Sequence, residues 1–283
     1  MKFDEIGYWS EMKLEIIRKY ASTYSLIIEK QREKGIRLDQ MYIDAFAGSG
    51  YHVAKGTKKI VDGSPLVALH VNPPFRSLHF VDLDGDKAEQ LRGLTSGQET
   101  VHVYHGDCND VLLTQILPQA RYEDYKRALC LLDPYGLHLN WQVIQTAGKM
   151  GSVEVFLNFP VMDMNRNVLW LNPSGVDPDD VARMTLFWGD ESWKQVAYDG
   201  KQDLFGYPEK QPNEVIAKAF RERLHCIGGF KFVPEPLAMR NSVGCIVYYL
   251  FFASQNSTGG KIVGEIFEKY KNQGATHGRQ ISH

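Results

Sequence analysis

Five short apolar runs, each ending in polar residues or glycine and separated by helical stretches, most strongly constrain how this chain can fold. The runs are 41–46, 77–84, 101–110, 128–136 and 153–160. Strands that alternate with helices predict βα units and a mostly parallel sheet, and therefore an α/β fold. Because ligands bind at the carboxyl ends of such strands, we expect the polar residues that end the runs to form a site.

The five runs define a predicted core, 41–160. The regions before and after this core also have recognisable patterns of apolar residues. Apolar residues at three- and four-residue steps predict one long amphipathic helix over 9–35. The final region, 213–272, offers a helix followed by two long β runs, and the simplest interpretation is a C-terminal β-hairpin that closes the sheet. A polar tail after Asn272 is expected to be frayed.

Two stretches lack a clear period. Residues 51–63 are expected to form a loop, after which Ser64 is expected to cap a helix that has Pro65 in its first turn. The region 162–212 is rich in aromatic residues and is interpreted as an insertion that covers the crevice. Its aromatic residues are Trp170, Phe187, Trp188, Trp193 and Phe205. We expect those from Phe187 to Trp193 to anchor the insertion to the core rather than to stack on a base.

Composition limits the class of protein. A chain of 283 residues that is 43% hydrophobic and 23% charged is expected to fold as one globular domain, 1–283. No stretch is long and apolar enough for a membrane helix, and the first residues lack a signal-peptide pattern, so we expect a cytoplasmic protein without membrane contact. The net charge of -2 neither requires nor excludes a nucleic-acid partner.

Metal and redox motifs are weak. The four cysteines lie far apart, so neither a disulfide scaffold nor a CxxC motif is indicated. His102, His105 and Cys108 have ligand-like spacing, but residues three apart on a strand point to opposite faces, so no metal is expected there.

Acidic residues and glycines follow the predicted strands in order. Asp44 precedes a loop with Gly48 and Gly50, and Asp82 follows about thirty residues later, where a carboxylate can accept both hydroxyls of a ribose. The sequence has neither a GxGxxG fingerprint nor a GKS or GKT loop, which disfavours NAD and ATP. An adenosine ligand without phosphates remains, namely S-adenosylmethionine. Asp84 is expected to cap the next helix.

The segment DAFAGSG, 44–50, resembles the first motif of the class I methyltransferases. That resemblance implies a Rossmann-like fold in which Gly48 and Gly50 approach the methionine part of the cofactor and Asp82 holds the ribose. It also implies that Asp107, with the amide of Cys108, reads the adenine. The full set of cofactor-binding residues that it implies is Asp44, Phe46, Ala47, Gly48, Ser49, Gly50, Asp82, Leu83, Asp107 and Cys108.

Residues 133–136, DPYG, stand where amino-group methyltransferases carry a DPPY-type motif. The segment has one proline, and its aromatic residue comes one position early, so it is closer to the DPFG of tRNA guanine-N2 methyltransferases. Asp133 and the Pro134 carbonyl would accept the hydrogens of an exocyclic amine, and Tyr135 would stack on the base. Gly136 completes this expected catalytic set. The alternative is an ordinary strand-end turn.

A narrower resemblance follows the whole chain. The segments YIDAFAGSG, GSPLVAL, FVDLD, HGDCND, LLDPYG, FLNFP, FWGDESW and YYLFFAS stand in the order of the three-Cys-motif partner (TcmP) proteins, and the chain is identified as a member of that family. Membership implies a radical-type partner protein whose three-cysteine motif holds an iron–sulfur cluster outside this chain.

Three functions remain to be compared. The first is S-adenosylmethionine-dependent methylation of an exocyclic amino group of a nucleobase or nucleic acid, linked to the three-cysteine partner. The second is a non-catalytic module of the same fold that scaffolds this partner or holds a nucleotide. A hydrolase is disfavoured because no GxSxG elbow is present.

Two further features each have two interpretations. The basic loop of Lys55, Lys58 and Lys59 either contacts phosphates or is simply solvated. Asn158 either holds a planar substrate or only precedes the proline that ends its strand.

Overall fold

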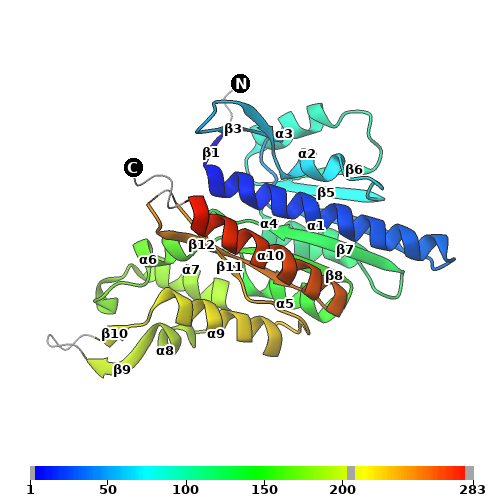
Figure 1. The fold of residues 1–283 in the computed structure, drawn as a ribbon. Coiled ribbons are helices and arrows are strands. Elements are labelled where there is room, and N and C mark those ends of the chain that lie inside the picture. The colour runs from blue at the N-terminus through cyan, green and yellow to red at the C-terminus, as the bar shows by residue number, and fades with distance from the viewer. Residues whose placement is uncertain (1–3, 203–207, 242, 278–283) are drawn as a thin grey trace.

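The structure is a computed structural model that describes residues 4–202, 208–241 and 243–277. Seven strands form the main sheet in the order β11-β12-β8-β7-β2-β5-β6 (Figure 1). The strands are β2 (Asp39–Asp44), β5 (Ser77–Asp82), β6 (Val101–His105), β7 (Lys126–Leu132), β8 (Val153–Phe159), β11 (Leu237–Arg240) and β12 (Ile246–Ala253). The first five are parallel, whereas β12 is antiparallel to both β8 and β11. The expected mostly parallel sheet and its closing hairpin are therefore confirmed.

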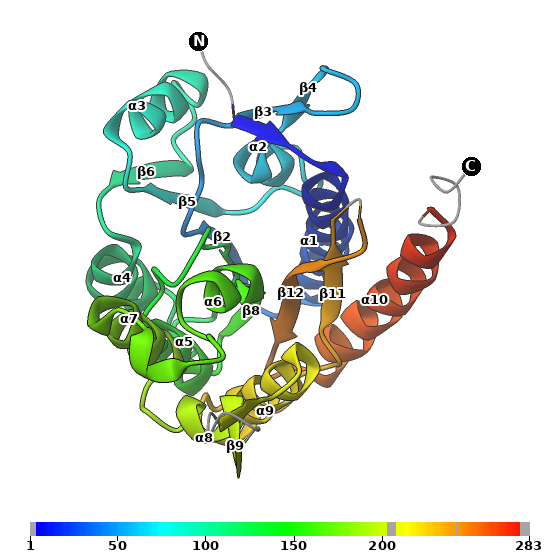
Figure 2. The same cartoon turned by 90° about the vertical axis from the view of Figure 1, so that its left-hand side faces the viewer.

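Helices cover both faces of this sheet (Figures 1 and 2). One face carries α1 (Tyr8–Glu33), α2 (Ser64–Leu69), α3 (Gly85–Leu94) and α10 (Ser257–His277). The other face carries α4 (Cys108–Val111), α5 (Trp141–Met150), α6 (Val161–Asn167), α7 (Pro178–Trp188), α8 (Trp193–Ala197) and α9 (Asn213–Cys226). Within β7, Leu129 and Leu131 enter one core while Cys130 enters the other. Strands that are buried on both faces need continuous apolar runs, which explains the sequence pattern.

Helix α1 is the long amphipathic helix that the sequence predicts. Its buried residues recur at three- and four-residue steps, as in Ile16, Ile17 and Tyr20. The ring of Tyr20 contacts Phe156 and Phe252 edge-on, with centroids 5.5 and 5.0 Å apart. The helix therefore packs on strands that come more than a hundred residues later in the chain.

The prediction of a loop over 51–63 is wrong in part. Residues Tyr51–Ala54 form β3 and residues Ile60–Asp62 form β4, which pair antiparallel, and β1 (Asp4–Ile6) pairs parallel with β3. The strands have only three or four residues, too few for a period to show in the sequence. Ser64 is also not the cap, because Gly63 holds that position and Ser64 is the first residue of α2.

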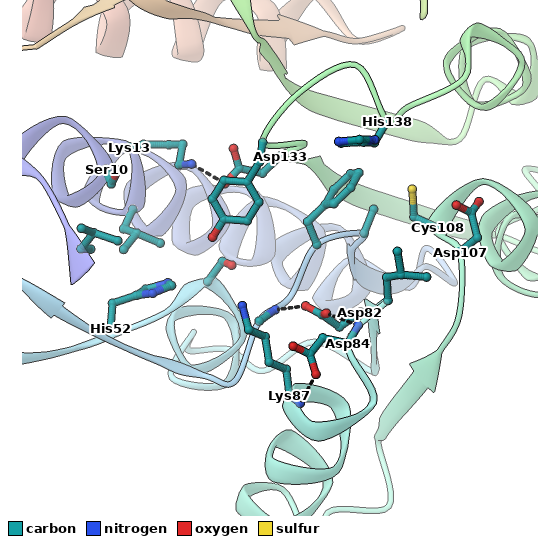
Figure 3. A pocket seen from close by; sticks show the side chains of 18 residues that line it. Ser10, Lys13, His52, Asp82, Asp84, Lys87, Asp107, Cys108, Asp133 and His138 are labelled. Carbon is teal, nitrogen blue, oxygen red and sulfur yellow. Dashed lines mark hydrogen bonds and ion pairs between the residues drawn. The ribbon is translucent and has the colours of Figure 1, made fainter. Parts of the chain in front are cut away.

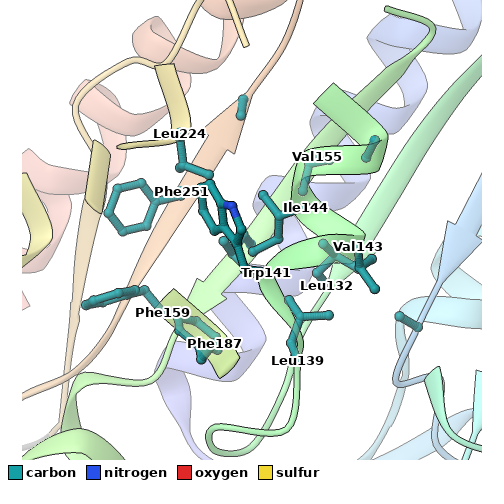
Figure 4. Packing of buried hydrophobic residues seen from close by; sticks show 14 of the residues in the cluster. Leu132, Leu139, Trp141, Val143, Ile144, Val155, Phe159, Phe187, Leu224 and Phe251 are labelled. Atoms are coloured by element: carbon teal, nitrogen blue, oxygen red, sulfur yellow. The ribbon is translucent and has the colours of Figure 1, made fainter. Parts of the chain in front are cut away.

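The insertion packs its aromatic residues inward, as expected. Phe187, Trp188 and Trp193 are buried, and the Phe187 ring lies 5.8 Å from that of Phe159 (Figure 4), while Trp170 is exposed and Phe205 lies outside the described residues. Among the described residues of the insertion, only those of α6, at its start, line the crevice, so the expectation that the whole insertion covers the crevice is wrong. The insertion also contains a 3-10 turn at Pro173–Gly175 and the strands β9 (Tyr198–Gln202) and β10 (Pro208–Lys210). Between α4 and β7 lie a π-helical turn (Leu112–Ile116) and a 3-10 turn (Leu117–Gln119).

The sequence interpretation missed helix α10. Val263, Phe267 and Tyr270 recur at helical spacing and are buried against the α1 face, so the period was present in the sequence. The helix continues to His277, beyond the point where a frayed tail was expected. Among the described residues, no helix combines the length and apolar character that crossing a bilayer requires.

Gly148 allows α5 to approach the 227–230 turn, and its replacement by alanine should destabilise the protein. An added Cβ would lie 1.9 Å from the carbonyl oxygen of Gly228, so the backbone must move. We expect Gly148→Ala to lower the free energy of unfolding by about 1–3 kcal/mol, measured by denaturant titration. Gly93→Ala is the matched control, because a Cβ in that helix meets nothing within 4 Å and should stabilise by about 0.5–1 kcal/mol. Equal effects of both changes would contradict this interpretation.

Candidate functional site

A cavity of about 470 Å³ lies at the carboxyl ends of β2, β5, β6 and β7 (Figure 3). The site predictions that line it are Phe46, Gly48, Asp82, Leu83, Asp107, Cys108, Asp133 and Tyr135. Those that lie outside its lining are Asp44, Ala47, Ser49, Gly50, Pro134 and Gly136. The strand order reverses between β2 and β7, where ligands of open α/β sheets bind. The predicted residues therefore converge where the fold favours a ligand.

Two glycines shape the loop after β2 in different ways. Gly48 has φ +67°, and a Cβ there would meet nothing within 4 Å, so this residue leaves the backbone open to the cavity. Gly50 has φ +94°, and a Cβ there would lie 3.1 Å from Leu94 and 3.4 Å from Leu91. Gly50 thus allows the loop to pack on α3, and it does not itself line the cavity.

Backbone amides orient the carboxylate of Asp82. The amide of Gly48 donates to Oδ2 at 2.7 Å, and the amide of Asp84 donates to Oδ1 at 2.8 Å. Each carboxylate oxygen has a further acceptor position, so Asp82 can still accept two hydroxyl groups. Asp84 caps α3 through the amides of Asp86 and Lys87, as the sequence predicts.

Asp107 and Cys108 offer an acceptor beside a donor. Asp107 accepts the amides of Asn109 and Asp110 through Oδ1 alone, at 2.8 and 3.4 Å. Cys108 is the first residue of α4, so its amide has no carbonyl acceptor within the helix. Burial, with the nearby Asp107 charge, raises the pKa of the Cys108 thiol to about 12, so this thiol is neutral and a poor nucleophile.

Lysine 13 of α1 is the main residue that the sequence interpretation missed. Its ammonium forms an ion pair with Oδ2 of Asp133, and Lys13 is 8% exposed (Figure 3). Burial lowers the pKa of this ammonium, but the Asp133 carboxylate, together with Tyr248 and Tyr135, leaves the pKa above its ordinary value. A lysine in register with the buried Ile16, Ile17 and Tyr20 is a signal that could have identified it.

The other residues of the DPYG segment are fixed by β8 and α6. The side-chain amide of Asn158 donates to the Pro134 carbonyl at 3.1 Å, so Asn158 does more than precede the proline that ends its strand. A Cβ at Gly136 would lie 2.9 Å from a carboxylate oxygen of Asp163, so a larger residue here would force the Asp163 side chain to move. Tyr135 is 79% exposed.

A second cavity, of about 270 Å³, lies on the far side of Asp133. It shares Ser10, Lys13, Asp133 and Tyr135 with the first cavity. Its remaining walls are Asn158, Pro160, Met162, Asp163, Arg166, Val247 and Tyr248. The shared residues thus stand between two spaces, an arrangement suited to two ligands that must meet.

Asn109 joins the two halves of the first cavity. Its side-chain amide donates to the carbonyl of His138 at 3.0 Å, and its oxygen accepts the amide of Asn140 at 2.7 Å. The loop after Asp133 is thereby tied to α4. His138 lines the cavity, although no sequence pattern singled it out.

The basic residues of the β3–β4 turn lie outside the lining of both cavities. Lys58 pairs with Glu5 at 2.8 Å, and Lys55 and Lys59 are exposed. Within the described ranges, no group of three or more His, Cys, Asp or Glu side chains is placed to hold a metal ion.

No protein-family model matches the chain, and no curated protein matches it in sequence. Solved structures do match it in fold. Protein LPL1258 of Legionella pneumophila is 14% identical over 90% of both chains, with a TM-score of 0.51. The chain has the Rossmann-like methyltransferase fold. A second match is the DszA carbon methyltransferase, which is 12% identical over 84% of this chain and 54% of its own, with a TM-score of 0.40. A third is a SAM-dependent methyltransferase of Leishmania major, which is 10% identical over 87% of this chain and 82% of its own, with a TM-score of 0.37.

Asp44 is fully buried at the end of β2 and does not line the cavity. The Phe46 amide donates to its Oδ1 at 3.2 Å, whereas Oδ2 is buried without a hydrogen-bond partner among the described residues. Burial raises the pKa of this carboxyl to about 7 from an ordinary value of 3.8. Asp44 therefore supports the loop from below and does not face the cavity.

Asp44→Asn should stabilise the protein more at pH 8 than at pH 5. Between the two pKa values the folded chain holds a proton that the unfolded chain has lost, so the free energy of unfolding falls as the pH rises from 5 to about 7 and levels off at higher pH. The variant lacks this ionisation and should gain about 2 kcal/mol relative to the wild type over that range. Denaturant titrations at pH 5, 6.5 and 8 would measure the gain. A difference that does not change with pH would show that burial of this carboxyl is not the cause.

Proposed function

We propose that this chain is an S-adenosylmethionine-dependent methyltransferase. The observation that carries the proposal is one cavity that gathers Asp82, Asp107 and the Cys108 amide at one side and Asp133 at the other. The shared wall of Asp133 and Tyr135 then leads into a second cavity for an acceptor. A transferase that brings two molecules together needs such paired spaces.

The residues of the first cavity fit the proposed cofactor. Asp82 would hold the ribose hydroxyls, because its two oxygens are oriented by backbone amides and each keeps an acceptor position. Asp107 and the Cys108 amide would hold the adenine, since they present an acceptor next to a donor. Gly48 would let the cofactor approach the loop. When bound, S-adenosylmethionine supplies a methyl group on a positively charged sulfur.

The acceptor that we propose is an exocyclic amino group of a nucleobase or nucleic acid. Lys13 bonds to Oδ2 of Asp133, so Oδ1 remains to accept an N–H of the amine. The Pro134 carbonyl lines neither cavity and already accepts a bond from Asn158, so its remaining lone pair would be a secondary acceptor. The exposed ring of Tyr135 offers a surface on which a base can stack.

The resemblance to the three-Cys-motif partner (TcmP) family extends this proposal. We propose that the chain works in the cytoplasm with a radical-type protein that carries an iron–sulfur cluster in its own three-cysteine motif. The cysteines of this chain are consistent with a cluster held elsewhere, because Cys108 and Cys130 are buried while Cys226 and Cys245 are exposed, all as free thiols. Co-purification of the two proteins would test the link.

A second candidate is a non-catalytic module of the same fold that holds a nucleotide or scaffolds the partner. It is favoured by the bonds that Asp133 and Pro134 already make, because Lys13 and Asn158 occupy part of the acceptor capacity that an amine needs. The two candidates differ in turnover and share the same ligand site.

Asp82→Ala should weaken binding of S-adenosylhomocysteine by about 10-fold to 100-fold in calorimetric titration, because two charge-assisted hydrogen bonds are lost. Asp86→Ala is the matched control, since Asp86 lies in the first turn of α3, just after Asp82 in the chain, and is exposed outside the cavity. Absence of binding to folded wild-type protein would overturn the cofactor assignment.

Asp133→Asn should leave the affinity for S-adenosylhomocysteine within about threefold of the wild type and lower methyl transfer at least about 100-fold. Transfer would be followed with radiolabelled cofactor on nucleobase, RNA and DNA acceptors. An equal loss of cofactor affinity in Asp82→Ala and Asp133→Asn would refute the separate roles. Cofactor binding without transfer to any of these acceptors would favour the non-catalytic module.

A further inference from the structure

The first cavity has a polar end that the assigned adenosine contacts do not use. In Figure 3, Asp107 and Cys108 lie at one end, Asp82 lies between, and Ser10, Lys13 and His52 lie at the other end. The strand order agrees, because Asp107 follows β6, the edge strand on the β2 side of the switch point, whereas Asp82 ends β5, which lies nearer to that point. Given the proposed function, a cofactor with its adenine at Asp107 and its ribose at Asp82 extends its amino-acid part toward Lys13.

The groups at this end of the cavity differ in charge. Burial, followed by the nearby Lys13 charge, lowers the pKa of His52, so this ring is neutral near pH 7. Lys87 also lines the cavity, but it pairs with Asp4 at 2.7 Å and stands beside Asp84 on α3. Among the described residues that line this end, Lys13 is therefore the cation that can meet an anionic ligand group.

The ammonium of Lys13 has bonding capacity left. It carries three N–H donors, and the bond to Asp133 uses one of them. Its side chain lines both cavities and lies over the Tyr248 ring at 5.4 Å, which holds it in place. The other charged groups of the cavity are mostly acidic, namely Asp82, Asp84, Asp107 and Asp133. A carboxylate would be repelled there unless it lay next to this cation.

We propose that Lys13 binds the carboxylate of the cofactor's amino-acid end while it holds Asp133. One buried ammonium then ties the tail of the cofactor to the carboxylate assigned to the acceptor amine. In this role Lys13 is a positioning residue for Asp133 and a specificity-determining residue for the cofactor. A ligand without the carboxylate loses the contact and keeps the adenosine contacts.

The test compares two ligands that differ at this end. S-adenosylhomocysteine carries the amino-acid carboxylate, and 5′-methylthioadenosine lacks it. Calorimetric titration of wild-type protein should show about 10-fold to 100-fold tighter binding of S-adenosylhomocysteine. Lys13→Met should abolish most of this preference, with the affinity for 5′-methylthioadenosine changed by less than about threefold. Lys87→Met, the matched control at the other lysine of the cavity, should retain the preference.

Loss of Lys13 alone leaves the Asp133 charge half-buried and unpaired, which can destabilise the fold. A second variant, Lys13→Met with Asp133→Asn, removes both charges and should show the same loss of preference. An equal weakening of both ligands, or a preference that persists in both variants, would overturn the role of Lys13. If wild-type protein binds neither ligand, the cofactor assignment itself fails. That outcome is distinct from binding of both ligands without a preference, which overturns only the role of Lys13.

Discussion

Hydrogen bonding between parallel strands is the constraint on which the site depends. The ladder from β6 through β5, β2 and β7 to β8 brings the carboxyl ends of five strands to one edge of the sheet. Asp82, Asp107 and Asp133 follow three of these strands and are brought to one cavity, although 51 residues separate the first from the last. A slip of one residue in any strand would turn such side chains toward the opposite face.

The ion pair between Lys13 and Asp133 connects this edge to α1. Two charges removed from water lose hydration free energy that their mutual attraction only partly restores, so such a pair contributes little net stability. Its effect is on geometry, because each charge restricts where the other can lie. Two lysines and four carboxylates line the cavity, and because Lys87 also pairs with Asp4, Lys13 is the cation that can meet an anionic ligand group at the α1 end.

Local patterns explain why much of the fold could be predicted and parts could not. The strand runs and α1 have a period that is visible within one segment, and the acids at the strand ends follow from it. The contacts of Lys13 with Asp133 and of Asn158 with Pro134 depend on residues 120 and 24 positions apart, which no local period encodes. Strands β3 and β4 are too short to show alternation. Helix α10 had a visible period that was overlooked.

The dependence of α1 on distant strands has a consequence for folding. During synthesis the helix emerges before the strands that cover it. The rings that cover Tyr20 belong to Phe156 and Phe252, and the partner of Lys13 comes 120 residues later. Until β12 is made, the apolar face of the helix has no complete surface on which to pack. Long-range contacts of this kind slow folding. Until they form, the apolar face of the helix is exposed, so nascent chains should need chaperones that bind this face.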